Sequence, residues 1–310
     1  MREVARKQSS AMRAARRKKL AFYWIVLALP VLQFCVFYIG VNVNSLFMAF
    51  QEYDFESGRF AWEGFSSMRL ALNDLFTQKF FVTAAKNSLI VYAVSLLIGI
   101  TLALLFSYFI YKKMPGAGLY KVILFMPQIV SVVVIVILYK YCVERAVPAL
   151  VELFTGEVRE GLLANPDTRF GTLLFFTVWA GFGTQVLMFT GAMGGISDSV
   201  VDAARIDGAS AWQEFFFVTI PSVYPTLITF LTVGVAHIFT NQMNLYSFYG
   251  TQADYDLYTF GYFLYKSVQE TKSMANYPYL ASFSLIFTFC AVPLTFAVRA
   301  LLVRFGPKTE

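Results

Sequence analysis

The chain has 310 residues, of which 58% are hydrophobic and only 14% are charged, and its formal net charge is +6. A water-soluble domain is about 45–50% apolar and about 25% charged. With a mean hydropathy of +0.60, too few polar side chains remain to cover a water-exposed surface. The composition therefore excludes a soluble enzyme, a disordered protein and a secreted disulfide-stabilised domain.

Six stretches are long and apolar enough to cross a membrane. About 20 mostly apolar residues span roughly 30 Å of hydrocarbon as a helix, and a helix pairs its backbone polar groups internally. The sequence thus predicts an all-α membrane protein with one transmembrane domain over 20–304, and Gln128 beside Pro127 predicts packing at a kink. The expected spans are 20–43, 87–111, 122–139, 170–193, 222–241 and 279–298.

A basic arm, residues 1–19, precedes the first span, and a short tail, 305–310, ends the chain. Lys and Arg concentrate in the cytoplasmic segments of membrane proteins. With both termini in the cytoplasm, most of the 25 Lys and Arg residues lie on that side, but fewer than half of the 19 acidic residues do. We expect the arm to anchor the topology on anionic membrane lipid, without binding nucleic acid. The apolar run behind it exceeds a signal-peptide core, so the first span should stay in the mature chain.

The cytoplasmic connector 194–221 has the local signals of a short helix followed by a sharp turn. Ser199 and Asp202 have the spacing of a capping box, which begins a helix. We therefore expect a helix over 200–206. Gly208 can adopt the left-handed backbone conformation that ends a helix, so it should form an elbow.

A second helix follows the elbow in the same connector. Ser210 and Gln213 form another capping-box pattern, which predicts a helix over 212–220. Pro221 and Pro225 are then expected to bend the chain into the fifth span. The exposed side of the two helices should carry small residues that let another protein approach closely, namely Ala203, Ala204 and Ala209.

The spacing within this connector resembles the EAA loop of ATP-binding-cassette importer permeases. The family usually has Glu at position 202, Ile at 218 and Leu at 220, and this chain differs conservatively at all three. The matching residues are Asp202-Ala203-Ala204, Gly208, Val218 and Ile220-Pro221. Other stretches are similar to the carbohydrate-uptake group of these permeases, namely Trp62–Phe65, Asn73-Asp74, Asn87–Leu89, Gly118–Lys121, Phe125–Pro127 and Trp179–Gly181.

The resemblance implies the permease fold of a type I importer in a bacterial cell membrane. Its expected partners are a second, homologous permease chain, two ATPase subunits, an extracytoplasmic solute-binding protein and a carbohydrate. ATP and Mg²⁺ would be bound by the ATPases, and this chain has no phosphate-binding G-x-x-x-x-G-K-[ST] pattern of its own. An amphipathic hairpin resting on the membrane is the alternative for the loop. The residues expected to couple to the ATPases are Asp202, Ala203, Ala204, Gly208, Ala209, Ile220 and Pro221.

Two polar faces within the spans are candidates for the solute pathway. Polar side chains are costly in lipid and usually face a cavity or another helix, and amides and hydroxyls match the donors and acceptors of a sugar. Trp179 and Tyr246 could stack on a sugar ring. Hydrogen bonding between helices is the alternative. The candidates are Thr177, Gly181, Thr184 and Gln185 in the fourth span, and His237, Asn241 and Asn244 at the outer end of the fifth.

Other classes of membrane protein fit less well. An ion-coupled secondary transporter of a polar solute is the main alternative, but it needs intramembrane carboxylates or broken helices, and the spans contain no Asp or Glu. The sequence has no arrangement typical of a catalytic site or a metal site. Its cysteines, Cys35, Cys142 and Cys290, are expected to be small buried apolar residues.

Overall fold

The computed structural model describes residues 2–307, with side chains from residue 16 onward. The remaining parts of the predicted arm 1–19 and tail 305–310 lie outside the described residues. The chain forms two compact units, the first of Met1–Leu70 with Ser273–Leu285, and the second of Ala71–Lys272 with Ile286–Glu310. The candidate site residues all belong to the second unit.

Residues 2–62 of the first unit form a long helix followed by a small hairpin. The helix runs through α1 (Arg2–Gln33), a π-helical turn (Phe34–Gly40) and α2 (Val41–Met48), and contains the predicted first span. The hairpin pairs β1 (Gln51–Asp54) with β2 (Arg59–Trp62) in antiparallel register. Within this unit Ser282 donates a hydrogen bond from Oγ to the Ala49 carbonyl at 3.1 Å.

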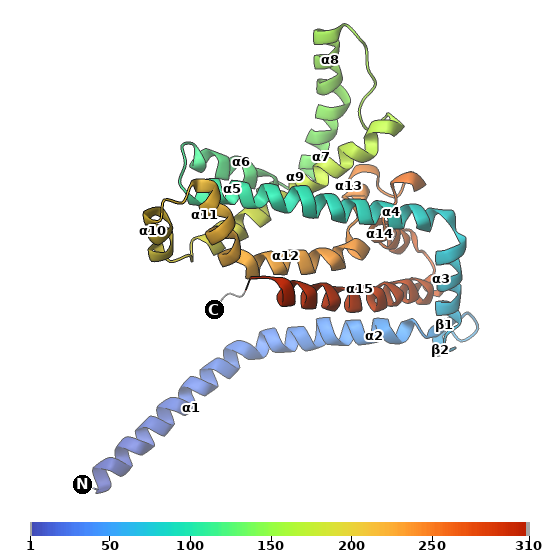
Figure 1. Ribbon diagram of the computed structural model, residues 1–310. Coiled ribbons are helices and arrows are strands. Elements are labelled where there is room, and N and C mark those ends of the chain that lie inside the picture. Colours follow the sequence, from blue (N-terminus) through green and yellow to red (C-terminus); the bar gives the residue numbers. More distant parts are fainter. Residues whose placement is uncertain (1, 308–310) are drawn as a thin grey trace. The chain divides into compact units, whose positions relative to one another are not determined.

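The remaining elements are helices (Figure 1). Two of them cross the boundary between the units, namely α3 (Ser66–Thr77) and α15 (Tyr277–Phe305), and a 3₁₀ turn (Met274–Asn276) precedes α15. The second unit contains α4 (Lys79–Val94), α5 (Thr101–Tyr111), α6 (Ala117–Ile129), α7 (Val132–Tyr141), α8 (Val147–Thr155), α9 (Pro166–Met193), α10 (Asp198–Ile206), α11 (Ala211–Glu214), α12 (Ile220–Thr240), α13 (Leu245–Tyr249) and α14 (Phe260–Glu270). Short π or 3₁₀ segments join some of them, namely Ser95–Ile100, Cys142–Ala146, Phe215–Thr219 and Tyr255–Leu257.

Among the described residues, five helical segments are long and apolar enough to cross a membrane, and a sixth segment is broken. The sequence predicts one continuous helix over 122–139, and this is wrong. The chain bends by 107° between α6 and α7, where Val130 adopts an extended backbone conformation and Ser131 a non-helical one. Pro127 lacks a backbone donor and weakens the last turns of α6. The prediction that Gln128 packs at a kink agrees with its contact to α9, where its side-chain amide donates a hydrogen bond to the Ala180 carbonyl.

The core of the second unit forms where α5, α6 and α12 pack against α9, and Figure 1 shows these helices side by side. Phe189 and Met193 are fully buried in this core. Ser107 of α5 donates a hydrogen bond to the Val186 carbonyl of α9 at 3.1 Å. A β-carbon at Gly183 would lie 2.6 Å from the Leu124 carbonyl oxygen of α6. Small residues therefore let the backbones approach closely, as is typical of helix packing in membranes.

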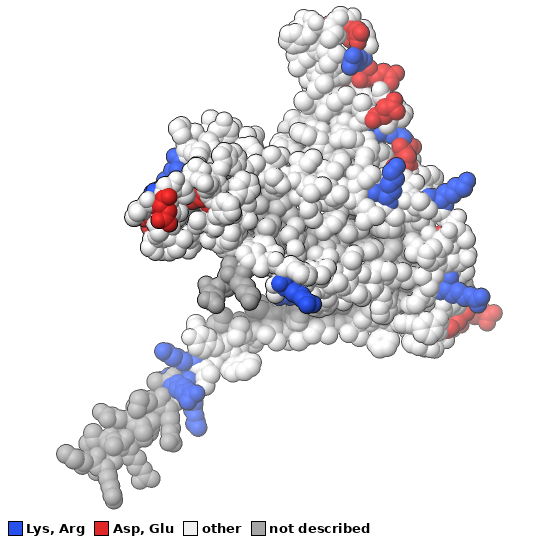
Figure 2. Space-filling model, in the orientation of Figure 1, with Lys and Arg blue, Asp and Glu red and all other residues white. Residues whose placement is uncertain are grey.

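The surface of the second unit carries its charges at the ends of the helices. On the face in Figure 2, Lys, Arg, Asp and Glu gather over α10 and over α8, and the helices between them present mainly uncharged residues. Many large apolar side chains are exposed there, as expected for helices that face lipid or another subunit. The prediction of buried cysteines is wrong for the same reason, because Cys35, Cys142 and Cys290 are free and exposed on helix faces of this chain.

Candidate functional site: a polar cavity and a coupling loop

The loop between α9 and α12 contains the expected helix, glycine elbow and second helix. The first helix, α10, ends at Ile206. Gly208 follows with a φ of +78°, the left-handed conformation that the sequence predicts. Ser210 and Gln213 then form a complete capping box at the start of α11. Local signals therefore shape the elbow and the start of the second helix.

The predicted start of α10 is wrong by two residues. The helix begins at Asp198, and its N-cap residue is Ser197, whose side chain does not cap it. The Ser199 hydroxyl lies 2.7 Å from the Ser197 hydroxyl, and Asp202 accepts a hydrogen bond from Arg205 at 3.2 Å. Both members of the expected capping box are thus engaged elsewhere.

The second helix continues beyond its predicted end. Helical structure extends from α11 through the π-helical segment Phe215–Thr219 into α12, without a break at Ile220. Pro221 follows the π-helical segment, in the first turn of α12, and Pro225 lies inside the helix. A π turn just before a proline absorbs the altered hydrogen bonding. The loop is therefore continuous with the fifth span.

The residues expected to contact the ATPases differ in exposure. Asp202, Ala203 and Gly208 are exposed, whereas Ala204, Ala209, Ile220 and Pro221 are half-buried. A shallow cavity of about 270 Å³ lies beside the elbow, lined by Asp207, Gly208, Ala209, Gln213, Phe217 and Val218. The elbow is thus accessible within this chain.

A cavity of about 290 Å³ lies between α4, α9 and α12. Most of its wall is apolar, and we call it the polar cavity for the polar side chains that also line it. It contains six of the seven predicted pathway residues, drawn from both predicted polar faces. Those residues are Thr177, Gly181, Thr184, Gln185, His237 and Asn241. Tyr92, Ser95 and Gly99 of the second span complete the wall, and sequence reasoning missed them. Their spacing of three and four residues on a charge-free helix is the signal that could have found them.

A second cavity of about 600 Å³ shares part of this wall and contains the seventh predicted residue. Asn244 lines it together with Thr177, Gly181, His237 and Asn241. The predicted helical face of residues 237, 241 and 244 is only partly correct, because α12 ends at Thr240. Asn244 adopts a left-handed conformation with a φ of +54°. The irregular segment after α12, and not helical periodicity, brings Asn244 to the cavity.

Hydrogen bonds show which polar side chains of the cavity wall already have a partner within the protein and which have none. Thr177 donates to the Leu173 carbonyl at 2.9 Å, and Thr184 donates to Gln128 of α6 at 3.0 Å. These two side chains therefore stabilise helices, as the alternative reading of the polar faces expects. Gln185 differs, because its buried Oε1 has no hydrogen-bond partner among the described residues. A buried acceptor without a partner is costly, and it leaves this oxygen free to accept a hydrogen bond.

The two aromatic residues expected to stack on a sugar line neither cavity. Trp179 packs against Phe176, with ring centroids 6.0 Å apart. Tyr246 packs against Tyr265 at 4.8 Å. The smaller cavity is lined instead by the aromatic rings of Tyr92 and Phe230.

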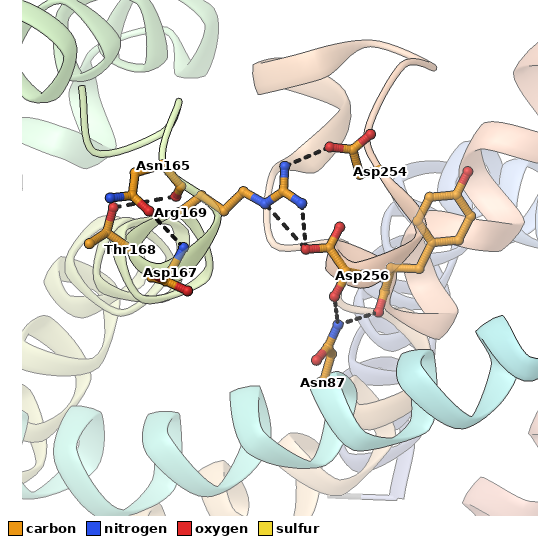
Figure 3. Close-up of polar contacts among 8 residues, drawn as sticks. Asn87, Asn165, Asp167, Thr168, Arg169, Asp254 and Asp256 are labelled. Carbon is orange, nitrogen blue, oxygen red and sulfur yellow. Dashed lines mark hydrogen bonds and ion pairs between the residues drawn. The ribbon is translucent and has the colours of Figure 1, made fainter. Parts of the chain in front are cut away.

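A charged cluster joins three segments near the start of α9 (Figure 3). Arg169 forms ion pairs with Asp254 and Asp256, each at 2.6 Å. Asn87 donates hydrogen bonds to the carbonyls of Asp256 and Tyr258, at 2.7 and 3.0 Å. The protein itself therefore holds both acidic residues in place.

A long apolar helix set, a polar intramembrane cavity and an elbowed loop together define a membrane transport subunit. The chain belongs to the family of binding-protein-dependent transport system inner membrane components, whose model matches residues 95–310. The match includes the elbowed loop, the larger cavity and all of the smaller cavity's lining except Val91 and Tyr92, and it supports the permease fold predicted from the sequence.

Individual relatives agree with this family. The chain is 26% identical over 230 residues to the lactose transport system permease protein LacF of Rhizobium radiobacter, covering 72% of this chain and 76% of that protein. It is 28% identical over 186 residues to the probable ABC transporter permease protein MG188 homolog of Mycoplasma pneumoniae, covering 58% of this chain and 54% of that protein. The second match thus spans about half the length of that relative.

A solved structure has the same fold. A bacterial ABC transporter involved in the import of the acidic polysaccharide alginate matches 94% of this chain and 99% of its own chain, with a TM-score of 0.74 and 19% identity. The similarity covers nearly all of both chains, so the arrangement of helices described above is that of a known importer permease.

Proposed function

We propose that this chain is one of two pathway-forming permease subunits of an importer that moves a carbohydrate into a bacterial cell by alternating access. The observation that carries the proposal is the convergence of two polar helix faces on one cavity. Gln185 of α9, His237 of α12 and Asn241, which directly follows α12, line the same space of about 290 Å³. The unpartnered Gln185 oxygen can accept a hydrogen bond from a solute hydroxyl.

The polar groups in the wall suit a sugar. Amide, hydroxyl and imidazole groups both donate and accept hydrogen bonds, as sugar hydroxyls require. Tyr92 adds an aromatic ring. Among the relatives, LacF is named for lactose and the structural neighbour for alginate. We therefore infer that the solute is a sugar, an oligosaccharide or a sugar derivative.

The driving force would come from two partner ATPases, which hold ATP and Mg²⁺ and receive the coupling loop. The exposed residues Asp202 and Ala203 and the accessible elbow at Gly208 support this docking. A second, homologous permease would complete the pathway, and an extracytoplasmic binding protein would deliver the solute. Both termini would lie in the cytoplasm, with the basic arm against anionic lipid.

Uptake into membrane vesicles tests the proposal. Right-side-out vesicles that contain the chain and its partners are supplied with the binding protein and with radiolabelled lactose or alginate oligosaccharides. Import should require ATP and should persist when an ionophore dissipates ion gradients. Uptake that survives ATP depletion but stops with the ionophore would instead support an ion-coupled secondary transporter.

Cross-linking tests the docking of the coupling loop. Cysteines introduced by Ala203→Cys and Ala209→Cys should cross-link to a nucleotide-hydrolysing neighbour in native membranes. Ala149→Cys is a matched control, because Ala149 is exposed on α8, at the opposite end of the second unit from α10. If the loop cross-links only to probes placed in the lipid, it rests on the membrane and does not contact an ATPase.

A further inference from the structure

A buried ion pair fastens the coupling loop to the second span. Lys112 follows the last residue of α5, and Glu214 is the last residue of α11. The two side chains form an ion pair and are only 15% and 6% exposed. Neither residue belongs to the loop pattern at positions 202–204, 208, 218 and 220–221.

A hydrogen bond and aromatic packing reinforce this connection. Tyr108, one turn before Lys112, donates from its hydroxyl to the Ala211 carbonyl at 3.0 Å. Its ring packs against Phe215, with centroids 4.9 Å apart. Lys112 Nζ lies 5.6 Å from the centroid of the Tyr108 ring, within the range of a cation–π contact. The end of α5 is thus attached to both ends of α11.

Burial makes the pair far more consequential than the other ion pair of the loop. Arg205 and Asp202 are each about 60% exposed, and exposed pairs contribute little because water and salt screen them. Removing one partner of a buried pair leaves an uncompensated charge away from water, which is strongly unfavourable. The Lys112–Glu214 contact is therefore maintained whenever α11 occupies this position.

The connection leads from the loop to the cavity. The loop is continuous with α12, so its movement is transmitted to the fifth span through the backbone. The second span is not adjacent to the loop in the sequence, because helices α6 to α10 lie between α5 and α11. Its segment Ser95–Ile100 nevertheless lines the polar cavity together with Tyr92. A displacement of α11 reaches this wall only through contacts, and the strongest of those contacts involve Lys112 and Tyr108.

We propose that Lys112 and Glu214 are positioning residues that couple movement of the loop to the second span, so that both walls of the cavity move together. This inference rests on the proposed function. With the pair intact, a displacement of the loop by a docked ATPase shifts α5 and α12 as one body. Without it, α12 alone follows the loop, and ATP hydrolysis proceeds with little solute movement.

Charge reversal and charge exchange in the intact complex test the proposal. The variants are Lys112→Glu, Glu214→Lys and the exchange that combines both. Lys113→Glu is the matched control, because Lys113 is the adjacent lysine and is exposed. The measured quantities are binding-protein-stimulated ATP hydrolysis and uptake of whichever probe the wild-type vesicles import, lactose or alginate oligosaccharides.

Each single reversal should lower the solute imported per ATP by about tenfold, because it places like charges in a buried site. The exchange should recover most of the loss, since the two residues interact directly. Lys113→Glu should match the wild type. Unchanged import per ATP in both single variants would overturn the proposal, as would an exchange variant that assembles at wild-type level but stays impaired.

Two further measurements keep the result interpretable. Glu214→Gln preserves the shape of the side chain, so it still reports on the pair if charge reversal prevents assembly. It should lower import per ATP while co-purification with the ATPases is retained, and normal import in this variant would count against the proposal. A wild-type complex that hydrolyses ATP but imports neither probe would contradict the proposed function. In that case the readout is the ATP-driven change in distance between probes on α5 and α11, and an equal change in wild type and both reversals would refute the role of the pair.

Discussion

Arg169 and Asp256, which are 87 residues apart in the sequence, are joined by two hydrogen bonds to a single carboxylate oxygen. Nε and Nη2 of the arginine donate to Asp256 Oδ2 at 3.2 and 2.6 Å. The third guanidinium nitrogen, Nη1, donates to Asp254 at 2.6 Å. Only the planar fork of an arginine can reach both carboxylates at once, so this residue holds the segment before α14 against the start of α9.

We expect Arg169→Gln to lower the free energy of unfolding of the detergent-solubilised protein by about 1 kcal/mol. The effect should be modest, because both carboxylates are more than half exposed to solvent. Thermal unfolding and hydrogen exchange at residues 254–258 provide the measurement. Arg169→Lys keeps the charge but not the fork, so it should lie between the variant and the wild type. An unchanged exchange rate in Arg169→Gln would show that the ion pairs do not order this segment.

Gly208→Val should abolish uptake and leave membrane insertion intact. The glycine has a φ of +78°, and a β-carbon there would meet no atom within 4 Å. The penalty is therefore one of backbone strain, about 1–2 kcal/mol for a residue in the left-handed conformation. That strain would displace α10 relative to α11.

Gly208→Asn is the matched variant for this elbow, because asparagine tolerates the left-handed conformation. It should retain most of the uptake measured in vesicles. If Asn and Val are equally inactive at normal membrane levels, the elbow requires an open surface and not merely a particular backbone conformation.

Gly183→Ala should destabilise the packing of α6 on α9. Its β-carbon would lie 2.6 Å from the Leu124 carbonyl oxygen, and overpacking of this kind costs about 1–3 kcal/mol. Gly171→Ala in the same helix is the control, because nothing lies within 4 Å of that position. The control should be neutral or slightly stabilising. Thermal unfolding compares the two, and equal midpoints would mean that α6 can move away at no cost.

Gln185→Met should raise the solute concentration for half-maximal uptake by about tenfold, the effect expected of one lost hydrogen bond. Methionine has a similar length but lacks the amide oxygen, Oε1, that is free to accept a hydrogen bond. Thr190→Val on the same helix is the control. The Thr190 hydroxyl also lacks a partner among the described residues but lines neither cavity. If both variants shift the half-saturation concentration equally, the effect does not arise from the cavity.

Several features followed from local patterns and agree with the structure. Long apolar runs predict membrane helices because lipid leaves the backbone no other way to satisfy its polar groups. Gly208 and the Ser210–Gln213 capping box were predictable because their hydrogen bonds lie within a few residues. The polar faces around Thr177 and His237 were visible for a similar reason, since polar side chains are conspicuous in apolar helices.

Other features depend on contacts between distant residues and could not be read from local patterns. The segment 122–139 looks like one uninterrupted span in the sequence. In the structure the last turn of α6 contacts α9 through Gln128, and the chain turns sharply after Ile129. Ser199 has ideal spacing for a cap, but its hydroxyl contacts Ser197 instead. Tyr246 seemed free to stack on a sugar, but Tyr265 already covers it.

The amino-acid sequence by itself determined that this chain crosses a membrane and carries a loop with the spacing of importer permeases. Both properties depend on composition and on residues close together in the chain. Only the tertiary structure decided which polar groups share a cavity and that Lys112 meets Glu214, 102 positions further along. Such pairings depend on how helices pack, which is set by shape complementarity between segments far apart in the sequence.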